Sequence, residues 1–269
     1  MPSRSILCCL CALLAACDTG PVQWEEPRQI TGRAASDARL QIDSVGEPLF
    51  LPRLVAPIVL PPGACAESRV FSRVGGGGEE WYAAWWMPRP DSSGELQVSR
   101  TIDGGRTWTP PVAADRRDRS ARGCGRLPPA IYADSAAGYV HLAYYLEPEQ
   151  GAGVWFTHSR ERGEVWHDPV GVVFGDDPAR ASVTSSGQTV LVAYEHPNAA
   201  EARVGLAISA TEGHFFEQHM VLSSANMVAS EPRVFLNGRD VAVSWTTRAR
   251  GTDASARAST IVVVGELRE

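Results

Sequence analysis

The chain has 269 residues, of which 44% are hydrophobic and 21% are charged. This composition excludes disordered, collagen-like and coiled-coil proteins, and the length suits one large all-β domain or two smaller domains. The formal net charge is −6 and every positive side chain is arginine. Such a charge argues against broad nucleic-acid binding, which usually needs a basic surface. The 8 tryptophans and 25 glycines favour many short strands joined by tight turns.

Residues 1–17 have the features of an export signal. Arg4 supplies a positive charge, and the apolar run Ile6–Ala16 that follows is shorter than the roughly 20 residues that a spanning helix needs. The ending Leu14-Ala15-Ala16-Cys17 resembles a bacterial lipobox. This resemblance implies a lipid on Cys17 and a protein anchored to a membrane of the bacterial envelope, facing the periplasm or the surface. The alternative is an ordinary secretory peptide cleaved near Ala16, with Cys17 incidental.

The remaining cysteines depend on that cleavage. Cys8, Cys9 and Cys11 lie in the discarded segment, and Cys17 would carry the lipid. Only Cys65 and Cys124 then remain, and two cysteines in an oxidising exported compartment most often pair. We therefore predict a disulfide between them, with two separate buried thiols as the alternative.

Three segments share the order hydroxyl residue, polar residue, glycine and aromatic residue, at fixed spacing. Their starts are separated by 58 and 50 residues. In such a segment the polar side chains bond to turn amides, the glycine adopts a positive φ, and the aromatic ring packs between strands. The positions are Thr101, Asp103, Gly105 and Trp108; then Ser159, Glu161, Gly163 and Trp166; then Ser209, Thr211, Gly213 and Phe216.

The repeat extends upstream of these segments. An apolar, alternating strand ends near Trp85, Tyr144, Tyr194 and Trp245, and an arginine precedes each of these aromatics by 12 to 18 residues. Each unit therefore contains four strands over about 50 residues, which is typical of a propeller blade. The four arginines, which recur at intervals of 57, 54 and 53 residues, are Arg69, Arg126, Arg180 and Arg233.

The pattern Thr101-x-Asp103-x-Gly105-x-x-Trp108 resembles the Asp box, or BNR repeat, of sialidases and related β-propellers. The second and third copies are degenerate. The resemblance covers roughly residues 65–269 and implies an all-β propeller whose boxes are structural and lie away from the central site. We expect residues 18–40 to be a linker and 41–269 to be the propeller. Five blades are favoured, with four or an incomplete six as alternatives, and an N-terminal strand could complete the last blade.

The same resemblance suggests where chemistry would lie. Sialidases bind the substrate carboxylate with three arginines and use a tyrosine–glutamate pair with an aspartate. The nearest match to the family's first arginine motif is Arg126-Leu-Pro128, but it stands in the middle of the chain, and the last tyrosine is Tyr194. The ligand-binding candidates are therefore Arg69, Arg126, Arg180, Arg233 and Glu195, with no catalytic residue assigned.

Inner strands line the centre of a propeller, so the four arginines could point toward one axis and bind an acidic group. The alternative is that each arginine pairs with an acid of a neighbouring blade, such as Glu67, Asp177 or Glu231. The histidines show no metal-ligand spacing, since His214 and His219 lie five apart around an expected turn, so no metal and no cofactor is expected.

Two functions follow from these observations. The first is a noncatalytic, membrane-anchored propeller that binds a protein or an acidic glycan in the envelope. The alternative is a sialidase-like exo-glycoside hydrolase that acts on an acidic sugar. Fold alone does not decide between them.

Overall fold

A computed structural model describes residues 20–30, 38–51, 56–74, 78–134, 137–251 and 258–268, with the backbone alone for residues 68–74 and 78. Cys17 lies outside these residues, as does the side chain of Arg69. The described residues form nineteen strands and no helix. Accordingly, no described segment is a helix long and apolar enough to cross a membrane.

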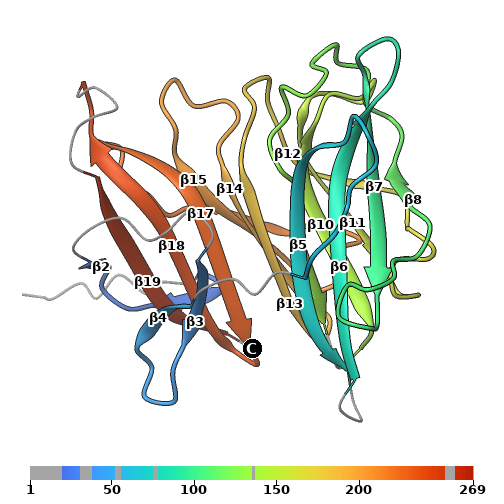
Figure 1. The fold of residues 1–269 in the computed structure, drawn as a ribbon. Coiled ribbons are helices and arrows are strands. Elements are labelled where there is room, and N and C mark those ends of the chain that lie inside the picture. The colour runs from blue at the N-terminus through green and yellow to red at the C-terminus, as the bar shows by residue number, and fades with distance from the viewer. Residues whose placement is uncertain are drawn as a thin grey trace, which may run out of the picture.

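Three consecutive groups of four strands form three antiparallel sheets, which we call blades 1, 2 and 3 (Figure 1). In each blade the strands pair in chain order. Blade 1 contains β5 (Cys65–Val74), β6 (Gly78–Pro88), β7 (Gly94–Thr101) and β8 (Val112–Asp115). Blade 2 contains β9 (Ala130–Asp134), β10 (Tyr139–Leu146), β11 (Gly153–Ser159) and β12 (Val170–Phe174). Blade 3 contains β13 (Ala181–Ser186), β14 (Thr189–Glu195), β15 (Val204–Ser209) and β16 (Gln218–Val221).

Blade 4 is assembled from both ends of the chain. Its first three strands are β17 (Met227–Asn237), β18 (Asp240–Ala249) and β19 (Ser259–Leu267). The outer edge of β19 pairs with two short N-terminal strands, β1 (Val22–Trp24) and β2 (Arg28–Ile30) (Figure 1). An N-terminal strand therefore completes the last blade, as expected. The structure differs from the expected linker at 18–40, because both short strands belong to the propeller sheet.

A two-stranded sheet stands apart from the four blades. It consists of β3 (Arg39–Ile42) and β4 (Pro48–Leu51). Leu40 from this hairpin packs in a small core with Val262 and Val264 of β19, on blade 4. The described part of the chain thus has four complete blades and, in the fifth position, a hairpin in place of a full sheet.

Apolar side chains pack the blades face to face. One cluster joins blades 1 and 2, with Trp86 and Tyr144 in edge contact at 5.9 Å between ring centroids. A second cluster joins blades 2 and 3, and a third joins blades 3 and 4 around Trp245. Tyr144, Tyr194 and Trp245 are therefore buried between sheets, where large rings contribute most to packing, and Trp85 is buried as well. The chain is an all-β propeller with four-stranded blades.

The antiparallel order gives each blade two distinct ends. The third strand runs into the Asp-box segment, so one end carries residues 101–108, 159–166 and 209–216; we call it the box end. The chain enters the first strand of each blade at the other end, which we call the entry end. Arg126 and Arg180, which stand just before β9 and β13, lie at the entry end.

Candidate functional site

Each Asp box closes the turn between the third and fourth strands of its blade. In the first box, the Asp103 carboxylate accepts hydrogen bonds from the Thr101 hydroxyl at 2.7 Å, and from the amide and hydroxyl of Thr107 at 2.9 and 2.6 Å. The Thr101 hydroxyl oxygen in turn accepts from the Gly105 amide at 3.1 Å. Gly105 has a φ of 90°, a left-handed conformation that favours glycine.

The degenerate boxes keep the hydroxyl at the first position. Ser159 Oγ accepts from the amides of Glu161 and Gly163, at 3.2 and 2.9 Å. Ser209 Oγ likewise accepts from the amides of Thr211 and Gly213. Both serine side chains are buried, and so are their bonds to Gly163 and Gly213, which satisfy amides that water does not reach. The aspartate position is less constrained, because Glu161 is exposed and Thr211 uses its hydroxyl to accept from the Phe215 amide.

The boxes also contact the preceding part of the chain. Gly163 lies against Tyr82 and Val98 of blade 1, and Gly213 lies against the Phe156 ring of blade 2. Phe216 packs on the same Phe156 ring at 5.4 Å. These contacts give the boxes a role in joining neighbouring blades, at the end of the sheets opposite the entry arginines.

The disulfide prediction is confirmed. Cys65 at the start of β5 is bonded to Cys124 in the segment between blades 1 and 2, with 5.5 Å between their Cα atoms. The bond ties these two blades together at the entry end.

Arg126 lies beside this disulfide and holds the segment between blades 1 and 2 to blade 1. Its guanidinium donates to the Asp118 carboxylate and to the backbone oxygens of Ser92, Gly123 and Ser120. Its side chain is 5% exposed, and it lies over the Trp86 ring at 5.7 Å. A guanidinium with its donors occupied in this way has little capacity left for a ligand.

The four arginines do not occupy equivalent positions, and here the structure differs from the expected ring. Arg69 lies opposite Ala83, Arg233 lies opposite Ser244, and the Arg180 carbonyl accepts from the Glu195 amide. Ala83 lies two residues before Trp85, and Ser244 lies one residue before Trp245. Glu195 lies one residue after Tyr194. Equal spacing along the chain therefore does not place these arginines at equivalent register positions in their blades.

Arg180 and Glu195 meet at the seam between blades 3 and 4. The buried Glu195 carboxylate accepts from the Arg180 amide at 3.1 Å and from the Glu231 amide at 2.9 Å. Its Oε1 atom lies 3.9 Å from the Arg180 guanidinium, and the Arg180 side chain is 51% exposed. One buried acid therefore joins the two blades and has an accessible cation beside it.

Glu231 extends this seam. It sits in the β17 bulge with a φ of 57°, a left-handed conformation that is uncommon for a residue with a side chain. Its carboxylate accepts from the Thr246 hydroxyl at 2.8 Å, and its carbonyl accepts from the Arg233 guanidinium at 3.3 Å. Arg233 also donates to the Ala38 carbonyl at 3.1 Å and is buried. We call Arg180, Glu195, Glu231 and Arg233 the seam cluster.

One tyrosine–glutamate pair was not singled out from the sequence. The Tyr82 hydroxyl donates to the Glu80 carboxylate at 2.6 Å, and Arg100 and Arg162 also bind that carboxylate. Burial and the neighbouring Glu80 charge raise the pKa of Tyr82 well above its usual value. The pair lies at the box end and links blade 1 to the second Asp box, so it serves interblade contact. A neutral tyrosine is also the weaker form for nucleophilic attack.

A further feature that the sequence analysis missed is a group of three histidines at the box end. Ring nitrogens of His158, His167 and His214 lie within 4.8 Å of one another. Their spacing in the sequence shows no motif, because they come from two blades. Alignment of the repeat could have found them, since His158 immediately precedes the second box, His167 follows it, and His214 lies inside the third.

The described residues also form an apolar groove of about 500 Å³ between β16 and the N-terminal strand β1. Trp24, Met220, Leu222 and Trp245 line it. This groove lies at the outer strands of blades 3 and 4, and neither the seam cluster nor Arg126 contributes to it.

No protein-family model and no curated protein matches the chain. Among solved structures, the chain is similar to the N11 neuraminidase-like protein of A/flat-faced bat/Peru/033/2010, at 11% identity and a TM-score of 0.50, covering 84% of this chain and 69% of that one. It is also similar to the Hadza microbial sialidase Hz136, at 15% identity and a TM-score of 0.46 over 72% of this chain. The chain spans 47% of that sialidase. An exo-1,5-α-L-arabinanase from a bovine ruminal metagenomic library gives 13% identity and a TM-score of 0.45, over 91% of both chains. Identities this low support the propeller fold alone.

Proposed function

We propose that this chain is an envelope β-propeller that recognises a sugar bearing an acidic group, with Arg180 as the principal ligand contact. The observation that carries the proposal is the half-exposed Arg180 guanidinium, which stands at the entry end beside a buried carboxylate. Guanidinium groups bind carboxylate and sulfate with two parallel hydrogen bonds. Lipid on Cys17 would hold the protein at a membrane, where such sugars are presented.

Several contacts support Arg180 over the other arginines. Arg126 is almost fully buried and bonded to Asp118, while Arg233 is buried and bonded to backbone carbonyls. Glu195 holds the backbone of Arg180 through a hydrogen bond to its amide, which fixes the position of the guanidinium without occupying it fully. The propeller fold is shared with the sugar-acting proteins named above, and this makes a sugar the ligand class to test first.

Glycoside hydrolysis is the second candidate, because the seam cluster contains two glutamates. Glu195 accepts from the Glu231 amide, and Glu231 keeps its own carboxylate beside Thr246. Many glycosidases use a pair of carboxylates, one as acid and one as nucleophile or base. In this structure Glu195 is engaged by two backbone amides, which favours a positioning role for it and recognition over hydrolysis.

A binding measurement with matched variants tests the proposal. Isothermal titration of the purified protein with sialyllactose, galacturonic acid and neutral lactose should show binding of an acidic sugar only. Arg180→Ala should abolish that binding, whereas Arg106→Ala, an exposed arginine at the box end, should leave it unchanged. Equal binding by the two variants would remove Arg180 from the site.

Chromatography of the same mixtures separates the two candidates. Recognition predicts that the sugar is recovered intact after prolonged incubation. Release of a monosaccharide that is lost in both Glu195→Gln and Glu231→Gln would replace recognition with hydrolysis.

A further inference from the structure

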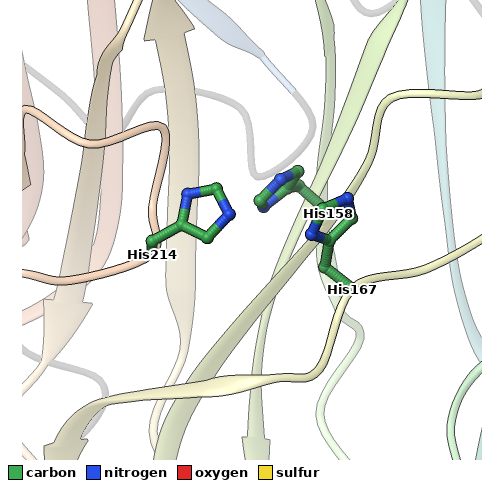
Figure 2. A group of neighbouring side chains, drawn as sticks. All are labelled: His158, His167 and His214. Atoms are coloured by element: carbon green, nitrogen blue, oxygen red, sulfur yellow. The ribbon is translucent and has the colours of Figure 1, made fainter.

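We propose that His158, His167 and His214 form a metal site that takes a divalent transition ion, with Zn²⁺ as the best match, and that this ion clamps blade 2 to blade 3. His158 is the penultimate residue of β11, and His167 follows the second Asp box in the same blade. His214 belongs to the third Asp box, in blade 3. Figure 2 shows the His214 ring facing the other two across the space between the blades.

The three rings are close enough to share one ion. The ring centroids of His158 and His167 are 4.3 Å apart, and those of His158 and His214 are 4.9 Å apart. Zinc binds histidine nitrogen at about 2.0–2.1 Å, so ligand nitrogens in a tetrahedral site are roughly 3.4 Å apart. The nitrogens here lie within 4.8 Å of one another, and rotations about the side-chain torsions can close the difference.

The hydrogen bonds of His158 and His214 leave one ring nitrogen of each available for a metal. His158 is buried, and its Nε2 atom has no hydrogen-bond partner among the described residues. A buried polar atom without a partner is costly, and a bound cation would satisfy it. The Nδ1 atom of His214 lies 2.6 Å from the Thr211 carbonyl, to which it can only donate. This bond leaves Nε2 of His214 as the lone-pair donor, the arrangement that metal-binding histidines commonly show.

The charges around the cluster also suit a cation held by neutral imidazoles. Burial, together with the neighbouring His167, His214 and Arg160 groups, lowers the pKa of His158 to about 3. The ring is therefore in its ligand form at neutral pH. Arg160 is paired with Glu212, which offsets its positive charge near the site.

The exposure of the three histidines indicates how many ligands a bound ion would have. His158 is buried, His167 is half-buried and His214 is exposed, so the cluster opens to solvent on one side. Three histidines with a water in the fourth position would complete a tetrahedral zinc site. Because the ligands come from two blades, the ion would stabilise the seam between them.

The test uses full-length protein without a histidine tag, treated with a chelator and then dialysed. Titration calorimetry with ZnCl₂ should show one site per chain, and the melting temperature should rise on zinc addition. Co²⁺ should give the intense visible absorption of a four-coordinate site. His214→Ala is the first variant, because this side chain is exposed and its loss should leave the fold intact.

Even outer hydrogen-bond partners of metal ligands change affinity by about 10–100-fold, so loss of a ligand should weaken zinc binding by at least that factor. We expect this for both His214→Ala and His167→Ala, together with loss of the thermal shift. His196→Ala is the matched control, because His196 follows β14 at the entry end and should bind zinc as the unmodified protein does. Unchanged zinc affinity in His214→Ala and His167→Ala, or no binding by the unmodified protein, would overturn the proposal.

Discussion

The first and third Asp boxes contrast in a way that separates sequence pattern from packing. The first matches the family pattern fully, and Asp103 gathers three hydrogen bonds, yet its Trp108 ring is only half-buried and donates to the Pro57 carbonyl. The third has lost its aspartate and tryptophan, yet its Phe216 is 5% exposed. The difference arises from what precedes each blade. Blade 2 offers Phe156 to the third box, whereas an irregular segment at residues 56–57 meets the first.

The largest expected effect therefore belongs to the degenerate box. Phe216→Ala removes a buried ring that packs on Phe156 between blades, and such truncations cost about 3–5 kcal/mol in the free energy of unfolding. Chemical denaturation of the variant and the unmodified protein would measure it. A cost below that of Trp108→Ala would reverse the comparison.

The second-largest effect on stability should come from the disulfide. It ties blade 1 to the following segment at the entry end, opposite the first box. Replacing both Cys65 and Cys124 with serine should lower the free energy of unfolding by about 2–5 kcal/mol. The unfolded chain regains the conformational freedom that a cross-link between residues 59 apart removes. The unmodified protein should melt at a lower temperature with reductant than without it, and the reduced protein should melt with the variant. No change on reduction would show that the bond adds nothing to blade 1.

Trp108→Ala should have a smaller effect, about 1–2 kcal/mol, since part of the side chain remains in water. Arg106→Ala is the control in the same turn, and its exposed side chain should change stability very little. Equal melting shifts for the two variants would show that the Trp108 ring is not packed.

The smallest expected effect is a change of stability with pH that arises from Asp103. The Thr107 hydroxyl, then its amide and the Thr101 hydroxyl, hold the pKa of the Asp103 carboxyl well below its usual range. A carboxyl with a lowered folded pKa stabilises the protein above its unfolded value of about 3.9, and that contribution fades as the pH falls toward the folded value. Asp103→Asn should therefore melt below the unmodified protein at pH 7, with a gap that narrows below about pH 4.

Thr211→Ala gives the comparison for that measurement. The third box has a hydroxyl at this position, which does not ionise, so the loss of its bond to the Phe215 amide should be independent of pH. A gap that narrows in acid for both variants would point to charges other than Asp103.

The sequence predicted features that repeat within single blades. Strand alternation, the spacing of Trp85, Tyr144, Tyr194 and Trp245, and the box residues all depend on local geometry, and together they led to the propeller. The Cys65–Cys124 bond was also predictable, because compartment and count left one pairing. These features need no knowledge of how one blade faces the next.

Features built between blades were not predicted, because spacing along the chain does not give the packing of one blade on the next. Arg126, Arg180 and Arg233 recur at nearly even spacing, but Arg126 and Arg180 stand before the first strand of their blades whereas Arg233 lies inside β17, so equal spacing did not give equal positions. The approach of Glu195 to the Glu231 amide, and of His214 to His158, depends on the packing of blades 2, 3 and 4. No spacing along one strand encodes it.

The pairing of β1 with β19 has a consequence for how the protein folds. Val22 lies opposite Leu267, so blade 4 can be completed only when the first described strand pairs with the last one. Closing a loop of roughly 240 residues costs about 2 kcal/mol more in chain entropy than closing a 20-residue hairpin. Blades 1 to 3 are built from neighbouring strands, so we expect them to form early and blade 4 to form last. Until then β19 presents an unpaired edge, the place where a newly made chain is most exposed to association with another copy.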